Sequence, residues 1–225
     1  MTSNLLWKPN QDQIDHRNLT AFAKQHGFAP DDYPALHQWS ITSRDSFWSS
    51  VWSFCDIVGD PGSDVLINPD SFPGSRWFPE ASLNFSENLL RYDDARTALV
   101  AITEQGERVT MTYAELRVEV AKFAAELEER GVEPGDRVAG WMPNVIETVI
   151  AMLGTTAIGA VWSSCSPDFG FEGALDRFGQ IEPKILVACD GYTYNGKTFD
   201  ITGNVDDVAE TIASIDHVIW CSLLG

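Results

Sequence analysis

Two short segments carry side chains whose chemistry suits a ligand with a planar base and phosphates. The first, residues 162–168 (WSSCSPD), follows an apolar stretch that is typical of a buried strand. At the carboxyl end of a parallel strand an exposed Trp can stack on a base, and small residues beside it let a ligand approach the backbone. Trp162, Ser163 and Ser164 are therefore candidate binding residues. The alternative is that Trp162 lies in the core, as most of the eight tryptophans must.

The second segment, residues 190–197 (DGYTYNGK), is predicted to be a loop after another apolar strand. Its Lys197 is one of few lysines in an acidic chain. A single ammonium group acts as a point charge toward phosphate, so Lys197 is a candidate phosphate contact. The alternative is an ordinary solvated surface lysine.

Catalytic and metal-binding residues are not predicted. No nucleophile, base and orienting group can be assembled from the strand ends. The four histidines and four cysteines lack the spacing of zinc ligands. Residues 154–159 (GTTAIG) lack the lysine of a phosphate-binding loop and continue an apolar helix, so we expect small residues that let this helix pack closely on a sheet.

Strand-like and helix-like segments alternate from Thr97 onward. The predicted strands cover residues 98–103, 109–112, 137–142, 160–164, 184–189 and 218–221. The predicted helices run from a capping box at Thr112 and Glu115 to Gly131, and over residues 145–158, 171–181 and 205–215. Strands separated by such helices pair in parallel with right-handed crossovers. We therefore predict an α/β fold with a partial, doubly wound, mostly parallel sheet.

Residues 1–95 differ in character, being rich in Trp, Phe and Pro. They are predicted to form a mostly helical or irregular extension, separate from a domain at 96–225. One helix is predicted after a capping box at Thr42 and Asp45, and a short one through residues 88–91. Residues 70–79 are predicted to be an irregular loop with buried aromatic side chains.

Composition and charge exclude some classes of function. The chain has 225 residues, 44% of them hydrophobic, and a net charge of −18. Because phosphate backbones require clustered Lys and Arg, we expect no nucleic-acid partner. The sequence also lacks a secretory signal and an apolar run long enough to span a membrane, so we expect no membrane partner and a cytoplasmic location.

Several blocks together resemble the adenylate-forming acyl-CoA synthetases, and the similarity runs along the whole chain. The blocks are WFP (77–79), LNFSENLL (83–90), TYAEL (112–116), GDRVA (135–139), PN (143–144), SSCSPDFG (163–170) and RFGQIEPK (177–184). The last two favour the acetoacetate-specific branch of that family. The resemblance assigns residues 1–95 to an extension of acetyl-CoA-synthetase type and 96–225 to the first part of the AMP-binding domain.

The resemblance implies a two-step ligase that uses ATP, Mg²⁺ and CoA to activate acetoacetate through an acyl-adenylate. It places Trp162 where an aromatic residue packs on the CoA adenine, with Ser163 and Ser164 beside it. It also places Lys197 at one of two cationic positions near the CoA phosphates; Tyr194 stands at the other. The family's phosphate loop, acid pocket and catalytic lysine are expected beyond Gly225, so the chain is expected to be inactive alone. The alternatives are a ligase for acetate or propionate, and a non-catalytic module that binds CoA or a partner.

Overall fold

The computed structural model describes residues 6–224, which form two units. The first unit ends at Leu83 and the second begins at Asn84. The boundary at residue 95 between extension and domain stays a prediction.

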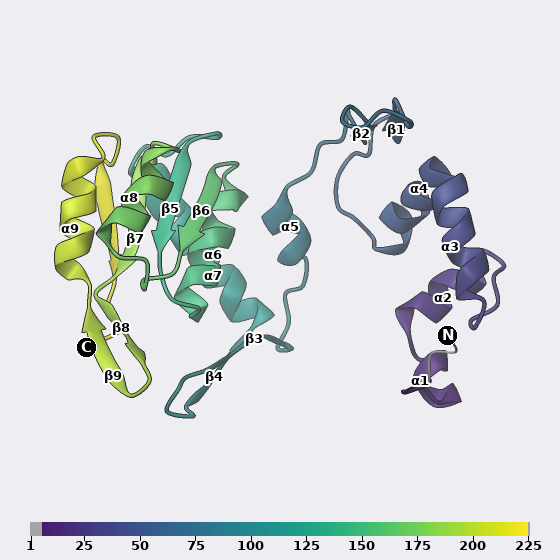
Figure 1. Cartoon of the computed structure of the whole chain (residues 1–225), viewed down its shortest axis with the longest axis horizontal. Helices are drawn as coiled ribbons and strands as arrows, with labels where there is room; N and C mark the ends of the chain where they lie inside the picture. Colours follow the sequence, from purple (N-terminus) through teal and green to yellow (C-terminus); the bar gives the residue numbers. More distant parts are fainter. Residues whose placement is uncertain (1–5, 225) are drawn as a thin grey trace. The chain divides into compact units, whose positions relative to one another are not determined.

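The first unit is mainly helical (Figure 1), and aromatic side chains make up much of its core. Phe22 is buried and meets Phe47 and Phe54 edge-on, with ring centroids 5.8 and 5.1 Å away. These rings supply the apolar area that so short a segment needs for a core. Its elements are α1 (Gln11–Asp15), α2 (Asn18–Gln25), α3 (Tyr33–Thr42), α4 (Arg44–Phe54), and the antiparallel pair β1 (Leu66–Ile67) and β2 (Arg76–Trp77).

Two predictions for this unit are wrong. Thr42 does not cap the helix that follows it, because it ends α3 and its hydroxyl donates a hydrogen bond to the carbonyl oxygen of Gln38. Ser43 is the N-cap of α4 instead. Residues 70–79 are irregular apart from β2, but Phe72 is fully exposed rather than buried. Of the aromatic residues there, Phe78 packs on Trp52 with a centroid distance of 5.0 Å.

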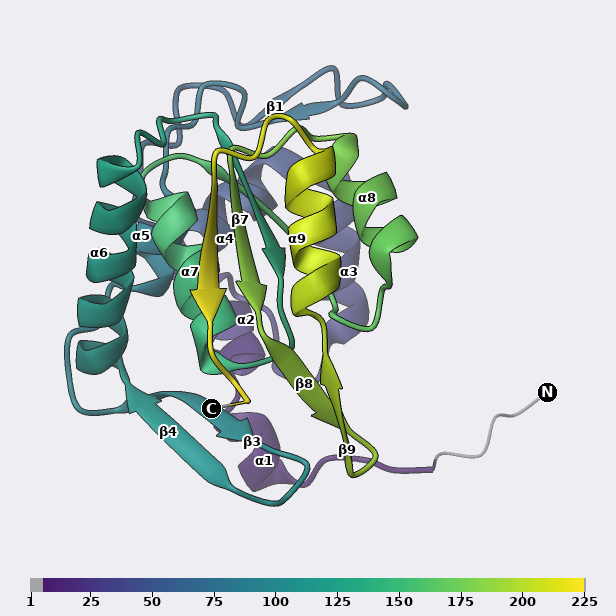
Figure 2. The ribbon, with the colours of Figure 1, turned by 90° about the vertical axis from the view of Figure 1, so that its left-hand side faces the viewer.

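The second unit is an α/β layer structure, as predicted. Its central sheet has the strand order β10-β7-β5-β6, and all neighbours are parallel. Helices α6 and α7 cover one face, and α8 and α9 cover the other (Figure 2). The elements are α5 (Phe85–Leu89), β3 (Thr97–Ile102), β4 (Arg108–Thr112), α6 (Tyr113–Glu129), β5 (Arg137–Trp141), α7 (Ile146–Ala157), β6 (Val161–Cys165), α8 (Phe171–Gly179), β7 (Ile185–Cys189), β8 (Gly191–Tyr194), β9 (Lys197–Asp200), α9 (Thr202–Thr211) and β10 (His217–Cys221).

Burial explains why these strands could be predicted from the sequence. All five residues of β7 are buried, and Trp141 of β5 and Phe178 of α8 are fully enclosed. Both faces of such a strand are covered by helices, so neither face carries polar side chains and the sequence is a continuous apolar run.

Helix ends in this unit follow local hydrogen bonding. The capping box of Thr112 and Glu115 is present at the start of α6. The short helix predicted through residues 88–91 is α5, which begins earlier because the side chain of Asn84 accepts a hydrogen bond from the amide of Glu87.

The small residues of α7 allow close packing, but against a helix. A Cβ atom on Gly154 would lie 2.8 Å from Cδ1 of Phe123 in α6. The prediction that this stretch packs on the sheet is therefore wrong at Gly154, because α6 approaches α7 there.

Candidate functional site

The carboxyl ends of the four parallel strands form one rim, which we call the sheet rim. Strand β5 comes first in the sequence of this sheet, with β6 on one side and β7 and β10 on the other. The direction of winding reverses between β5 and β7, and open α/β sheets bind ligands in the crevice at such a point. The sheet rim is therefore the candidate functional site.

The loop after β6 is held against the end of β5. The indole Nε1 of Trp141 donates a hydrogen bond to the carbonyl oxygen of Ser166 at 3.2 Å. The amide of Met142 donates to the carbonyl oxygen of Cys165, also at 3.2 Å. Further along, the Arg177 guanidinium lies 4.1 Å above the ring of Phe169. Backbone groups and a fully enclosed side chain thus define this part of the rim.

Residues 190–197 form the start of a hairpin rather than the predicted loop. Strands β8 and β9 pair antiparallel, and Asn195 and Gly196 connect them with φ angles of 51° and 70°. Such a two-residue turn strongly prefers Asn-Gly, so the sequence did contain the signal. Lys197 is exposed and pairs with Tyr194 directly after the turn.

The base of this hairpin is fixed by Asp190, a residue that had no predicted role. Its carboxylate accepts hydrogen bonds from the Ser222 hydroxyl and the Leu223 amide, both at 2.8 Å, and from the Leu224 amide. These bonds, that of Leu223 first, lower the pKa of Asp190 below the ordinary value for an aspartate. The next residue, Gly191, has no room for a side chain, because a Cβ atom there would lie 2.3 Å from the carbonyl oxygen of Phe199.

Trp162 lies inside β6 and not at its end, so the prediction of a strand-end position is wrong. The strand continues to Cys165, and Trp162 is aligned with Val138 of β5. Its half-buried indole packs over Gly140, where a Cβ would lie 2.3 Å from Cζ2. Ser163 is half-buried and Ser164 exposed beside it. Trp162 therefore combines a core contact with a partly accessible ring.

Trp162 and Lys197 stand on two elements that do not pair with each other, β6 of the central sheet and β9 of the hairpin. Trp162 and Ile185 are both aligned with Val138, at the level where β7 begins. From Ile185 the chain runs through β7 into β8 and ends opposite Lys197 (Figure 2). That stretch spans at most about 30 Å at about 3.3 Å per residue.

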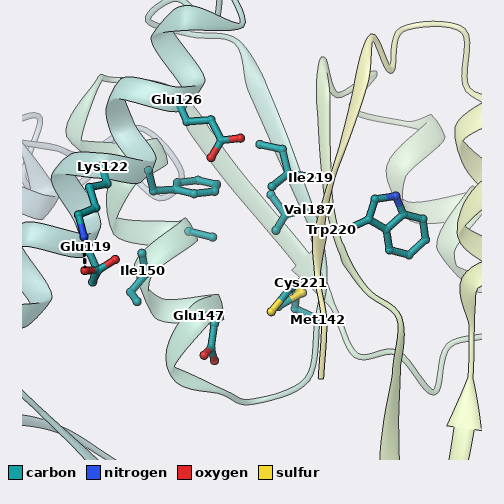
Figure 3. A pocket seen from close by; sticks show the side chains of 12 residues that line it. Glu119, Lys122, Glu126, Met142, Glu147, Ile150, Val187, Ile219, Trp220 and Cys221 are labelled. Carbon is teal, nitrogen blue, oxygen red and sulfur yellow. Dashed lines mark hydrogen bonds and ion pairs between the residues drawn. The ribbon is translucent and has the colours of Figure 1, made fainter. Parts of the chain in front are cut away.

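A separate cavity of about 290 Å³ opens on the face of the sheet that α6 and α7 cover. Figure 3 shows Val187, Ile219 and Cys221 on its sheet side, while Trp220 points to the opposite side of β10. Lys122 at its rim is 2.7 Å from the Glu119 carboxylate. The lining residues do not include Trp162, Ser163, Ser164 or Lys197.

The thiols near these regions are poor nucleophiles. Burial raises the pKa of Cys165 and Cys189 to about 11, and burial together with Glu147 raises the pKa of Cys221 to about 12. Within residues 6–224, no group of three or more His, Cys, Asp or Glu side chains could hold a metal ion. None of the helices described there is long and apolar enough to cross a membrane.

Comparisons with known proteins cover nearly the whole chain. The family model described as AMP-binding enzyme matches residues 85–222, and the model described as acetyl-coenzyme A synthetase N-terminus matches residues 33–89. Acetoacetyl-coenzyme A synthetase of Rhizobium meliloti is 42% identical over 93% of this chain and 33% of its own length. Acetoacetyl-CoA synthetase of Danio rerio is 37% identical over 97% of this chain and 33% of its own.

A solved structure agrees with these relatives. Acetoacetyl-CoA synthetase from Streptomyces lividans matches with a TM-score of 0.92 and 41% sequence identity, over 99% of this chain and 36% of that chain. The present chain thus spans about a third of the length of the relatives that it matches.

Proposed function

Because the chain belongs to the AMP-binding enzyme family, we propose that it supplies the N-terminal third of a ligase that joins acetoacetate to CoA. The observation that carries the proposal is the 42% identity to acetoacetyl-coenzyme A synthetase of Rhizobium meliloti over 93% of the chain. The structural match to acetoacetyl-CoA synthetase from Streptomyces lividans supports it.

The proposed reaction has two steps. Acetoacetate first attacks the α-phosphate of ATP, which gives acetoacetyl-AMP and pyrophosphate, and Mg²⁺ offsets the phosphate charge. The CoA thiol then attacks the acyl carbon, loses its proton, and displaces AMP. Since the chain spans about a third of its relatives, we propose that residues 1–225 are inactive alone and act within a longer polypeptide, which we call the complete protein.

The proposed contribution of this chain to the reaction is to CoA binding. Lys197, exposed at the hairpin turn, would contact a CoA phosphate. The partly accessible ring of Trp162 would stack on adenine, with Ser163 and Ser164 beside it. The two contacts are proposed independently of each other. In the complete protein we expect Trp162→Ala and Lys197→Ala each to raise the KM for CoA; an unchanged KM would reject that residue's contact.

The test of the function is turnover by the complete protein with acetoacetate, acetate and propionate. AMP release that requires both CoA and acid, with the highest kcat/KM for acetoacetate, is the expected result. A preference for acetate would contradict the proposed acid. Binding of CoA without AMP release from any of the three would indicate a non-catalytic module instead.

A further inference from the structure

The turn of the β8–β9 hairpin is bound by a carboxylate from a second hairpin, the one formed by β3 and β4. Glu104 Oε1 accepts a hydrogen bond from the Asn195 amide at 2.7 Å, and Oε2 accepts one from the Gly196 amide at 3.1 Å. The tips of the two hairpins lie side by side in both views (Figures 1 and 2). We call this pair of hydrogen bonds the Glu104 clasp.

The backbone geometry of both turns favours this contact between the Glu104 carboxylate and the two amides. Asn195 and Gly196 have φ angles of 51° and 70°, the left-handed backbone of a two-residue hairpin turn. Successive amides in such a turn form a small concavity that binds anions. On the other hairpin, the Gly106 amide donates to the Thr103 carbonyl oxygen at 2.9 Å, which makes Glu104 the second residue of a tight turn. Its side chain therefore projects from the tip.

The clasp fixes the end of the hairpin that is otherwise farthest from the core. The base is held by Asp190, and Tyr192 packs against the main core cluster and stacks on Phe199 with centroids 5.1 Å apart. The exposed tip has no comparable apolar packing, since Tyr194 and Lys197 are both exposed. Hydrogen bonds to an ionised group are roughly twice as strong as neutral ones, so the clasp can order the tip.

We propose that Glu104 is a positioning residue for the phosphate contact of Lys197. This inference rests on the proposed function, in which Lys197 binds a phosphate of CoA. Lys197 directly follows the two clasped amides, so the Glu104 carboxylate sets the position from which the lysine side chain reaches the ligand. Glu104 itself does not touch the ligand. It aligns the turn before binding, which lowers the ordering cost that CoA would otherwise have to offset.

The first measurement tests the clasp in the 225-residue chain. Hydrogen exchange of the Asn195 and Gly196 amides is compared in wild type, Glu104→Ala and Glu107→Ala. Glu107 is an exposed acid of the same hairpin and makes the matched control. We expect exchange at both amides to become about tenfold faster in Glu104→Ala, the size expected for losing a charge-assisted hydrogen bond. Glu107→Ala should match wild type. Equal rates in all three proteins would overturn the proposal.

The second measurement is the Kd for CoA of the complete protein, by calorimetry, with the Kd for ATP as the internal control. Glu104→Ala should raise the Kd for CoA about five- to tenfold, on the scale of one lost charged hydrogen bond, and leave the Kd for ATP unchanged. Glu104→Asp should partly restore the CoA affinity. Because Glu104 acts through Lys197, the double variant with Lys197→Ala should bind CoA no more weakly than Lys197→Ala alone.

The outcomes separate this inference from the proposed function. If Lys197→Ala weakens CoA binding but Glu104→Ala does not, the CoA contact stands and the positioning role is rejected. If neither variant changes the Kd for CoA, the proposed phosphate contact fails and the role of Glu104 fails with it. Additive losses in the double variant would mean that Glu104 acts independently of Lys197, which also overturns the inference.

Discussion

At the scale of single residues, Asp190 connects the end of β7 to the segment after the last strand. Its carboxylate accepts hydrogen bonds from the Leu223 and Leu224 amides, and its backbone oxygen accepts one from the Ile201 amide. One residue therefore fixes both the base of the β8–β9 hairpin and the course of the chain after β10. Because the carboxylate is ionised in these contacts, their strength depends on pH.

The pKa of Asp190 is lowered in the folded protein, mainly by the Leu223 amide. A lowered pKa contributes stability that is present above the ordinary aspartate pKa and is lost as the pH falls through the folded value. We therefore expect the urea midpoint to fall on acidification below about pH 5, and to fall less steeply in Asp190→Asn. Asp206→Asn removes an exposed carboxylate of α9 and is the control. If the urea midpoint depended on pH identically in wild type and Asp190→Asn, Asp190 would not hold the segment after β10.

Trp162 shows how much of a candidate site residue could be predicted from the sequence. The residue type and the small neighbours were sufficient to select it, but they could not show that β6 continues to Cys165. Its close contact with Gly140 depends on which strands are neighbours. That neighbour relation comes from the tertiary fold and not from local spacing.

At the scale of elements, the two predicted capping boxes differ in the structure and give a matched test. Thr112 caps α6 with both reciprocal hydrogen bonds, whereas Thr42 ends α3. Thr112→Ala should cost about 1 kcal/mol of the free energy of unfolding, as for other N-caps. Thr42→Ala should stay within about 0.5 kcal/mol. Urea unfolding of the two variants measures this, and equal costs would contradict the assignment of the caps.

The central strands and the helices that cover them were largely predictable because their local patterns are strong, whereas strands β8 and β9 were predicted as a loop. The run of β7 is apolar throughout, and α6 begins and ends with recognisable signals. The Glu104 clasp was not predictable, because it joins residues 91 and 92 positions apart in the sequence. Only the relative placement of two hairpins reveals it.

At the scale of the whole molecule, the chain is strongly acidic, with a net charge of −18. The sum of its charges therefore repels polyanions, and the proposed binding of CoA would depend on individual cations. Among the lysines of the second unit, Lys197 is exposed at the hairpin turn, while Lys122 and Lys184 are paired with Glu119 and Asp136. This distribution of charge favours the hairpin as the place of the proposed phosphate contact.

A ligase that activates its acid as an acyl-adenylate, as proposed for the complete protein, catalyses a half-reaction that needs no CoA. The most direct measurement is exchange of labelled pyrophosphate into ATP by the complete protein, with and without acetoacetate and in the absence of CoA. We expect exchange that depends on acetoacetate, because a reversible acyl-adenylate forms before CoA enters. Exchange that is absent without CoA, or that proceeds equally well without any acid, would contradict the proposed ligase function.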